Sequence, residues 1–441
     1  MAEGACTSLG AGVAAPLPRE EVSAPPGRLS LRRNLSWMSV GRGVFAATQW
    51  GVLAVLAKLS TPEVVGQFGL ALAVCAPAYK LSNLGLRKAQ STDVRREHPF
   101  ANYWRLRTIT NACALLAVAA WAAGSGYGAE TALVIAIVAA HKAIEAQSEV
   151  CYGLFESQER VDRVARSLML RGPLALLLLA AGVAATGELV VGVTGELVGA
   201  LLVLLFHDLR LAGRSRTARD GPQRPPFEGR ALGRLARQTL PLGVAGWLLG
   251  LQQSIPNYFI AHELGLEALG FFSAMAYVLV AGNQFMMALG HSASARLARH
   301  FATGRIASFQ RLLLAMAAFG VATGGAALLA VWLFGEWILR VFYTADYAAY
   351  ADVFALLMGA ALFRNLASLF QFGVTAARSF RSQAVHQAAV ALGALLASAL
   401  LVGPYGLHGA AVATVITYAL DFAGSAGLSF WFARRRLRAP A

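Results

Sequence analysis

Positive charge is distributed along this chain in a pattern that limits its possible folds. Of the 38 Lys and Arg residues, 31 fall into seven short polar segments, which alternate with loops that carry almost no cations. Long apolar stretches separate these segments from the loops. Because Lys and Arg gather in the cytoplasmic loops of multi-pass membrane proteins, we expect the basic segments in the cytoplasm. The loops near Glu63, Glu130, Glu188, Glu263 and Pro404 are expected to face outward.

The composition also favours a membrane protein. Apolar residues make up 57% of the chain and charged residues 14%, whereas soluble domains average about 25% charged residues. The net charge of +15 then reflects topology, and no nucleic-acid partner is expected. A helical span needs about 20 apolar residues. We predict an all-α integral membrane protein with about twelve transmembrane helices, at residues 34–58, 64–86, 108–124, 129–154, 167–186, 189–209, 238–262, 266–290, 312–334, 352–376, 382–403 and 407–433.

Five regions are expected along the chain. Residues 1–33 are predicted to be a disordered cytoplasmic tail, since they mix Ala, Gly, Pro and Glu without an apolar run. They lack the pattern of a signal peptide, so the first span is expected to remain as an uncleaved anchor. The other regions are an N-terminal six-helix bundle (34–211), a cytoplasmic linker (212–237), a C-terminal six-helix bundle (238–433) and a second cytoplasmic tail (434–441).

An internal repeat becomes visible when the chain is shifted by 204 residues. With six spans in each half, both halves enter the membrane from the same side, and the repeat axis should run along the membrane normal. Two such bundles leave a central cleft, which favours transport by alternating access. The alternative is that the matches arise by chance in a biased composition. The matching pairs are Arg33 and Arg237, Gln49 and Gln253, Glu63 and Glu267, Gly66 and Gly270, and Phe68 and Phe272.

Polar residues inside the spans are the candidate functional residues. A charge at the centre of the bilayer costs about 2.5–3.5 kcal/mol or more, so it usually faces a water-filled cavity or a partner. Cations predominate here, which favours an anionic substrate, phosphate in particular. Glu145, Glu149 and Asp421 are candidates for coupling transport to a proton or cation. The predicted substrate-cavity residues are Arg42, Gln49, Lys80, Asn83, Arg87, Lys142, Gln253, Asn257, Arg364 and Asn365.

Several of these residues also have a structural interpretation. The charges of span 129–154 could form ion pairs that only tie helices together. Arg42 and Lys80 could extend towards the cytoplasmic lipid head groups, as long basic side chains near helix ends do. His207 and Asp208 lie at the end of a span, where we expect a solvated edge.

No motif for bond-making chemistry is present in the sequence. The GxxxxGK[ST] loop, HExxH and GxSxG are all missing. We therefore expect a protein that is not an enzyme, has no cofactor and draws energy from an ion gradient, the membrane potential or a downstream reaction. Cys6 lies in the tail and Cys75, Cys113 and Cys151 lie in spans, so neither a disulfide framework nor a metal site is expected.

The N-terminal third resembles a known family. Residues 32–87 begin with RRNLSWMSVGRGVF, pass a short outward corner with Glu63, Gly66 and Phe68, and end on Leu84-Gly85-Leu86-Arg87. This run is similar to the opening of the Wzx-type polysaccharide-biosynthesis flippases, a branch of the multidrug/oligosaccharidyl-lipid/polysaccharide exporter superfamily. The resemblance covers residues 32–107 in sequence and the whole chain in span count.

The resemblance implies a V-shaped pair of bundles that moves an undecaprenyl-diphosphate-linked oligosaccharide to the outer leaflet of a bacterial inner membrane. The implied partners are that lipid-linked substrate, membrane lipids, and a polysaccharide polymerase or chain-length machinery. Two alternatives stay open. One is an ion-coupled antiporter of small molecules or drugs with the same fold. The other is a polymerase or ligase, which would need a larger outward loop than the longest one here, residues 335–351.

Overall fold

The computed structural model describes residues 31–93, 97–220, 228–377 and 379–438, and these residues form helices without any strand. Residues 1–30 and 439–441 of the predicted tails lie outside the described residues, whereas 31–33 begin the first helix and 434–438 continue the last one. The helices are α1 (Leu31–Leu59), α2 (Pro62–Ser82), α3 (Leu86–Thr92), α4 (Phe100–Gly124), α5 (Ala129–Ser157), α6 (Val161–Thr186), α7 (Leu189–Val203), the π-helix η1 (Leu204–Asp208), α8 (Leu209–Asp220), α9 (Gly229–Glu263), α10 (Gly265–Ala302), α11 (Ile306–Phe342), α12 (Ala345–Ala348), α13 (Ala351–Ala376) and α14 (Phe380–Arg438).

Twelve of these helical segments are long enough to cross a bilayer. Nine stretches of the described chain meet both the length and the hydropathy expected of a span. The polar helices α5 and α9 add two more, since their 29 and 35 residues exceed the roughly 20 that a span requires. Helix α14 is broken at Gly406, whose φ of 57° is left-handed, so its 59 residues cross twice. The prediction of an all-α integral membrane protein with twelve spans is confirmed.

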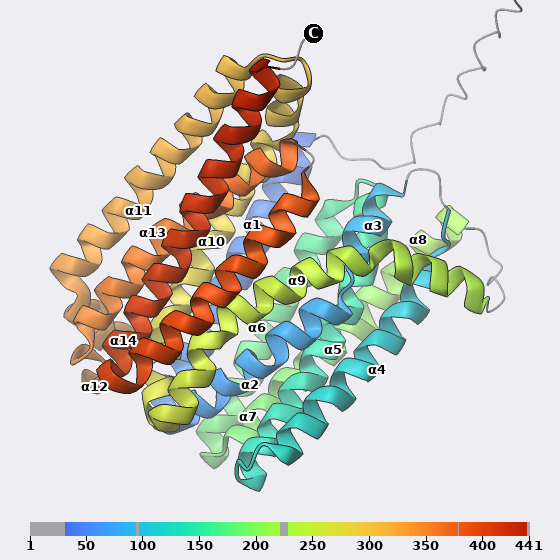
Figure 1. The fold of residues 1–441 in the computed structure, drawn as a ribbon. Coiled ribbons are helices and arrows are strands. Elements are labelled where there is room, and N and C mark those ends of the chain that lie inside the picture. The colour runs from blue at the N-terminus through green and yellow to red at the C-terminus, as the bar shows by residue number, and fades with distance from the viewer. Residues whose placement is uncertain (1–30, 94–96, 221–227, 378, 439–441) are drawn as a thin grey trace, which may run out of the picture.

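The spans form two bundles (Figure 1). In the first, α1 packs along α6, α6 along α7 and α4 along α5, whereas in the second α13 packs along α10, α11 and α14. Helix α2 joins the two, because it packs against both α9 and α10. Parts of α8 and α9 occupy the predicted linker 212–237, and its residues 221–227 lie outside the described chain.

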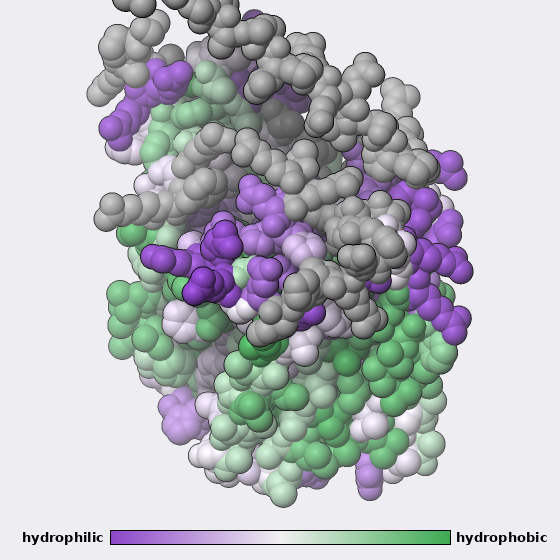
Figure 2. All heavy atoms as spheres, turned by 90° about the vertical axis from the view of Figure 1, so that its right-hand side faces the viewer, coloured by the Kyte–Doolittle hydropathy of each residue, from purple (hydrophilic) through white to green (hydrophobic). Residues whose placement is uncertain are grey.

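The surface follows the expected division between lipid and water. Figure 2 looks onto the side where α8 lies and shows hydrophobic side chains over the lower part, with hydrophilic side chains gathered above them. Large apolar side chains such as Leu116, Leu177, Trp332 and Leu400 are at least 64% exposed. Such side chains on helices of spanning length are suited to contact lipid.

The predicted repeat appears directly in the packing of α2 against α10. A Cβ atom on Gly66 would overlap the carbonyl oxygen of Leu266, and a Cβ atom on Gly270 would overlap the carbonyl oxygen of Pro62. Gly66 and Gly270 differ by 204 positions, as do Pro62 and Leu266, so the two contacts are related by the sequence repeat. The backbones touch here because neither crossing residue has a side chain.

Two further bonds join the bundles near this crossing. Trp50 Nε1 donates to Tyr343 Oη at 2.9 Å, and Lys58 Nζ donates to the carbonyl oxygen of Val341 at 2.7 Å. Both connect α1 to the end of α11. The crossing and these bonds therefore join the bundles at the end predicted to face outward.

We predict that Gly66→Ala and Gly270→Ala each destabilise the protein by about 1–3 kcal/mol, because the added methyl group overpacks the crossing. The control is Gly43→Ala in α1, where a Cβ would meet no atom within 4 Å. That change should be neutral or stabilise by up to about 1 kcal/mol through helix propensity. Thermal unfolding of the purified protein measures the difference, and equal midpoints for all three variants would contradict the prediction.

Candidate substrate cavity

A cavity of about 570 Å³ lies between the two bundles. Its walls come from α1, α2, α3, α5 and α6 of the first bundle and α9, α10, α13 and α14 of the second. The cavity therefore exists only because the two halves are held apart along part of their length. A change in the angle between the bundles would change its shape and access.

The structure brings nine of the ten predicted substrate-cavity residues into the walls of this cavity. Asn365 is the exception: it is buried and does not belong to the lining, although its neighbour Arg364 does. Asn365 lies about 100° further round α13 than Arg364, and its side chain does not reach the cavity lining. The nine lining residues are Arg42, Gln49, Lys80, Asn83, Arg87, Lys142, Gln253, Asn257 and Arg364.

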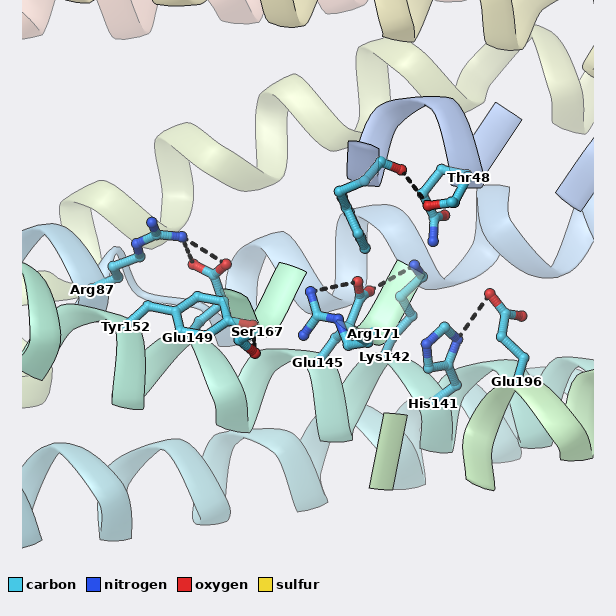
Figure 3. Close-up of polar contacts among 12 residues, drawn as sticks. Thr48, Arg87, His141, Lys142, Glu145, Glu149, Tyr152, Ser167, Arg171 and Glu196 are labelled. Carbon is cyan, nitrogen blue, oxygen red and sulfur yellow. Dashed lines mark hydrogen bonds and ion pairs between the residues drawn. The ribbon is translucent and has the colours of Figure 1, made fainter. Parts of the chain in front are cut away.

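One face of α5 carries a series of ion pairs along the cavity wall (Figure 3). Lys142 Nζ lies 2.7 Å from Glu145 Oε2, and Arg171 of α6 lies 3.2 Å from Glu145 Oε1. Arg87 pairs with Glu149 at 2.8 Å and with Glu156 at 2.6 Å. Residues three and four apart lie on the same side of a helix, which is why these α5 side chains line up.

Arg171 was not among the predicted residues, although the structure places it at the centre of this wall. Its side chain is only 4% exposed. The guanidinium carbon lies 5.1 Å from the centre of the Phe45 ring and 5.8 Å from that of Tyr152. Tyr152 in turn hydrogen-bonds Ser167 at 2.7 Å. The signal was available in the sequence, since Arg171 is an arginine inside the predicted span 167–186.

Three cations of the cavity have no carboxylate partner among the residues that the structure describes. Arg42 Nε donates to Met38 Sδ at 3.3 Å, and Lys80 Nζ donates to Gln253 Oε1 at 2.8 Å. Arg364 stacks over the Tyr418 ring, with its guanidinium carbon 5.4 Å from the ring centre. These three come from α1, α2 and α13, so both bundles contribute unpaired positive charge to the same space.

The cavity as a whole is strongly cationic. Six Lys and Arg residues line it against the two carboxylates Glu145 and Glu149, an excess of four positive charges. Buried cations are costly without a partner, and the excess would be offset by a bound anion. Arginine offers paired N–H groups that match phosphate oxygens, and lysine adds a compact charge. The arrangement is suited to a ligand with more than one negative charge.

The three predicted ion-coupling carboxylates occupy two different places. Glu145 and Glu149 line the cavity, where both are engaged in the ion pairs described above. Asp421 lies outside the cavity, inside the second bundle. Its carboxylate accepts hydrogen bonds from Gln371 and Gln387 Nε2, each at 3.2 Å, and its Oδ1 lies 2.9 Å from His386 Nε2. These three partners were not predicted.

The pair of His141 and Glu196 is a separate tie between α5 and α7. The two groups are 3.5 Å apart and each side chain is 3% exposed (Figure 3). Neither residue lines the cavity. The ionisable side chains of α5 therefore point in two directions. Lys142, Glu145 and Glu149 face the cavity, and His141 faces the interior of its own bundle.

Comparison with solved structures identifies the class of fold. An inward-facing multidrug resistance MATE family transporter of the MOP superfamily matches with a TM-score of 0.65 and 13% identity, covering 92% of this chain and 96% of that one. A MOP superfamily transporter from Pyrococcus furiosus, in which reversed polarity of the binding pocket suggests a different function, matches with a TM-score of 0.64 and 14% identity, covering 93% and 97%. The chain has the fold of the MOP superfamily, as the resemblance implied.

The sequence also has a curated relative over most of its length. The capsular polysaccharide biosynthesis protein CapF of Staphylococcus aureus is 23% identical over 404 residues, which cover 87% of this chain and 96% of that protein. No family model matches the sequence. The expected resemblance to the polysaccharide branch of the superfamily is therefore supported by fold and by a relative in polysaccharide biosynthesis.

We predict that Glu145→Gln destabilises the protein by about 3–5 kcal/mol, because it leaves the partly buried Lys142 and the buried Arg171 without their shared carboxylate. Arg171→Gln should cost less, since Glu145 keeps its bond to Lys142. The double variant should lose less than the sum of the two. Thermal unfolding of purified variants tests the order, with Glu336→Gln on the exposed surface as the control. If Glu145→Gln behaved like that control, the ion pairs would not stabilise the bundle.

Proposed function

We propose that this protein flips an undecaprenyl-diphosphate-linked oligosaccharide to the outer leaflet by alternating access. The observation that carries the proposal is that Arg42, Lys80 and Arg364, which have no carboxylate partner among the described residues, face one cavity from both bundles. A diphosphate carries several negative charges and would bridge groups from the two halves. Sugars attached to it would occupy the polar remainder of the cavity.

The physical need for such a cavity is clear. Each unpaired polar group in hydrocarbon costs several kcal/mol, so a glycan linked to a diphosphate cannot cross the bilayer unaided. Cations within the cavity would replace the hydration of the phosphates. The prenyl chain is as apolar as lipid and would stay in the membrane while its head group crosses between the bundles.

The comparisons support this choice within the superfamily. The relative at 23% identity is named for capsular polysaccharide biosynthesis, which favours a surface polysaccharide as the product. We place the protein in a bacterial inner membrane with both termini in the cytoplasm, on the distribution of Lys and Arg. A polysaccharide polymerase or chain-length machinery would then use the flipped units. On this proposal the protein is not an enzyme.

The second candidate is an ion-coupled antiporter of small molecules or drugs. The shared fold with a multidrug resistance transporter and the cavity carboxylates Glu145 and Glu149 favour it. Both carboxylates are already paired with cations, however, and the cavity has an excess of positive charge. A cationic drug would be repelled from such a space, so an antiporter of this sequence would have to carry anions.

Deletion of the gene tests the proposal most directly. Lipid-linked oligosaccharide should accumulate on the cytoplasmic leaflet while surface polysaccharide disappears, and the wild-type gene should reverse both effects. Accumulation is measured by extraction of the lipid-linked pool and its accessibility to a glycan-binding probe. Unchanged glycan together with altered export of small anions or drugs would support the antiporter instead.

We predict that Lys80→Gln and Arg364→Gln each reduce surface polysaccharide at least about tenfold in the complemented strain, because each removes a desolvated interaction with phosphate. The matched control is Arg340→Gln, whose side chain is 63% exposed and pairs with Glu336 on the surface. The control should complement fully. Full complementation by both cavity variants, at wild-type protein levels, would remove the basis of the cationic-cavity proposal.

A further inference from the structure

A second hollow lies on the outer face of the first bundle, where α6 meets η1 and α8. We call it the arginine groove. Its volume is about 510 Å³, and it shares no residue with the central cavity. Nothing in the proposed transport cycle uses it. The main residues that line it are Arg166, Leu170, Phe206, Arg210, Leu211 and Arg214.

Two helix faces build the groove. Phe206, Arg210 and Arg214 recur every four residues, so they lie on one side of η1 and α8. Arg166 and Leu170 have the same spacing on α6 and face them across the groove. The five-residue π-helix η1 lies at the join, and such segments are rare and occur frequently at functional sites.

The positive charge of the groove is offset only in part, since Asp162, one turn before Arg166 on α6, lies near Arg166 but pairs with Arg160. Arg166, Arg210 and Arg214 are exposed, and none of them forms an ion pair with another described residue. The guanidinium of Arg210 stacks over Phe206 at 5.2 Å, and that of Arg166 stacks over Trp37 at 5.4 Å. Aromatic rings thus hold two of the three arginines in place while their N–H groups remain available.

The nearest carboxylate in the sequence is turned away from these arginines. Asp208 is completely buried, and its Oδ1 lies 2.9 Å from His207 Nδ1. The expectation that Asp208 lies at a solvated edge is therefore wrong. The π-helical turn carries Asp208 into the bundle while Phe206 and Arg210 point outward, so the one acidic residue of η1 leaves the groove cationic.

The remaining lining is apolar and faces the region where lipid is expected. Leu170 is 50% exposed and Phe206 is 57% exposed, and both belong to stretches long enough to cross a membrane. Arg210 and Arg214 lie beyond them, at the end of the span where the basic segment 210–237 begins. The groove therefore has an apolar part within the span and a cationic part at its end.

We propose that the arginine groove binds one anionic phospholipid, with the head-group phosphate between Arg166, Arg210 and Arg214 and the acyl chains along Leu170 and Phe206. The position of the arginines supports this occupant, since basic pockets at the cytoplasmic ends of membrane helices are suited to anionic lipid head groups. Arginine matches phosphate oxygens through paired N–H groups. A soluble phosphate would use only the cationic part and leave the apolar part exposed. The proposal does not depend on what the central cavity carries.

The test is native mass spectrometry of the full-length protein in detergent, with phosphatidylglycerol or phosphatidylcholine added. The wild type should retain one phosphatidylglycerol after mild activation and no phosphatidylcholine. The triple variant Arg166→Gln, Arg210→Gln, Arg214→Gln should lose that lipid, with binding at least about tenfold weaker. The control triple variant Arg296→Gln, Arg299→Gln, Arg311→Gln removes the same charge from exposed positions of α10 and α11 and should retain it.

Three outcomes would overturn the proposal. The first is equal retention of phosphatidylglycerol by the two triple variants. The second is displacement of the lipid by millimolar inorganic phosphate, which would make the groove a site for free anions. The third is a dimer that only the groove variant converts to a monomer, which would make the groove an interface between copies of the chain. If the triple variant failed to fold, Arg214→Gln alone should still weaken lipid binding, because Arg214 is exposed and has no partner among the described residues.

Discussion

The cost of placing charge inside hydrocarbon governs the structure of this protein. Lys142, Arg171 and Arg87 lie within or at the end of membrane-spanning helices, and each is paired with a carboxylate of α5. Without Glu145 and Glu149 these cations would have to be hydrated or moved to the surface. The α5 carboxylates thus allow α3, α5 and α6 to present a polar wall inside a membrane. The central cavity depends on that wall, because a polar cavity needs polar sides that are stable when it holds only water.

The two bundles share a fold but differ in how their charges are satisfied. In the first bundle, Arg87, Lys142 and Arg171 pair with carboxylates of α5, whereas Arg42 and Lys80 bond only neutral groups among the described residues. The second bundle contributes Arg364, whose guanidinium stacks on the face of Tyr418. Between them, Lys80 of α2 bonds Gln253 of α9. The position of Gln253 corresponds by the repeat to Gln49, which itself accepts a bond from Tyr277 of α10 at 3.3 Å. Neutral amide side chains from both halves therefore lie where the bundles meet. Hydrogen bonds between such neutral groups can break and re-form at a low cost in free energy.

Most of the fold, and the membership of most residues in the cavity wall, could be predicted from the sequence. The twelve spans and the break near residue 406 follow from hydropathy, which does not depend on side-chain detail. The repeat matched Gly66 with Gly270, but only the structure shows that the helices cross there. What the sequence could not supply was the rotation of each helix and the partner across it. Asn365 was grouped with Arg364 although only Arg364 lines the cavity. Glu156, which pairs with Arg87, was missed because it lies just beyond the predicted span 129–154. Asp208 was misplaced because a π-helical turn changes the facing of all residues after it.

The sequence left two interpretations open for the charged residues of α5, and their ion pairs in the structure settle the question. Lys142, Glu145 and Glu149 could have been either structural ties or cavity residues, and the structure shows that they are both. This double role has a consequence for an anionic ligand. On the proposed function, a phosphate in the cavity would bind Arg42, Lys80 and Arg364 without breaking any ion pair, because none of the three has a carboxylate partner in the part of the chain that the structure describes. The three cations lie on α1, α2 and α13, so a ligand that bridges them adds an attraction between the bundles that the empty cavity lacks. Binding of an anion would therefore favour whichever arrangement of the bundles brings these helices closest.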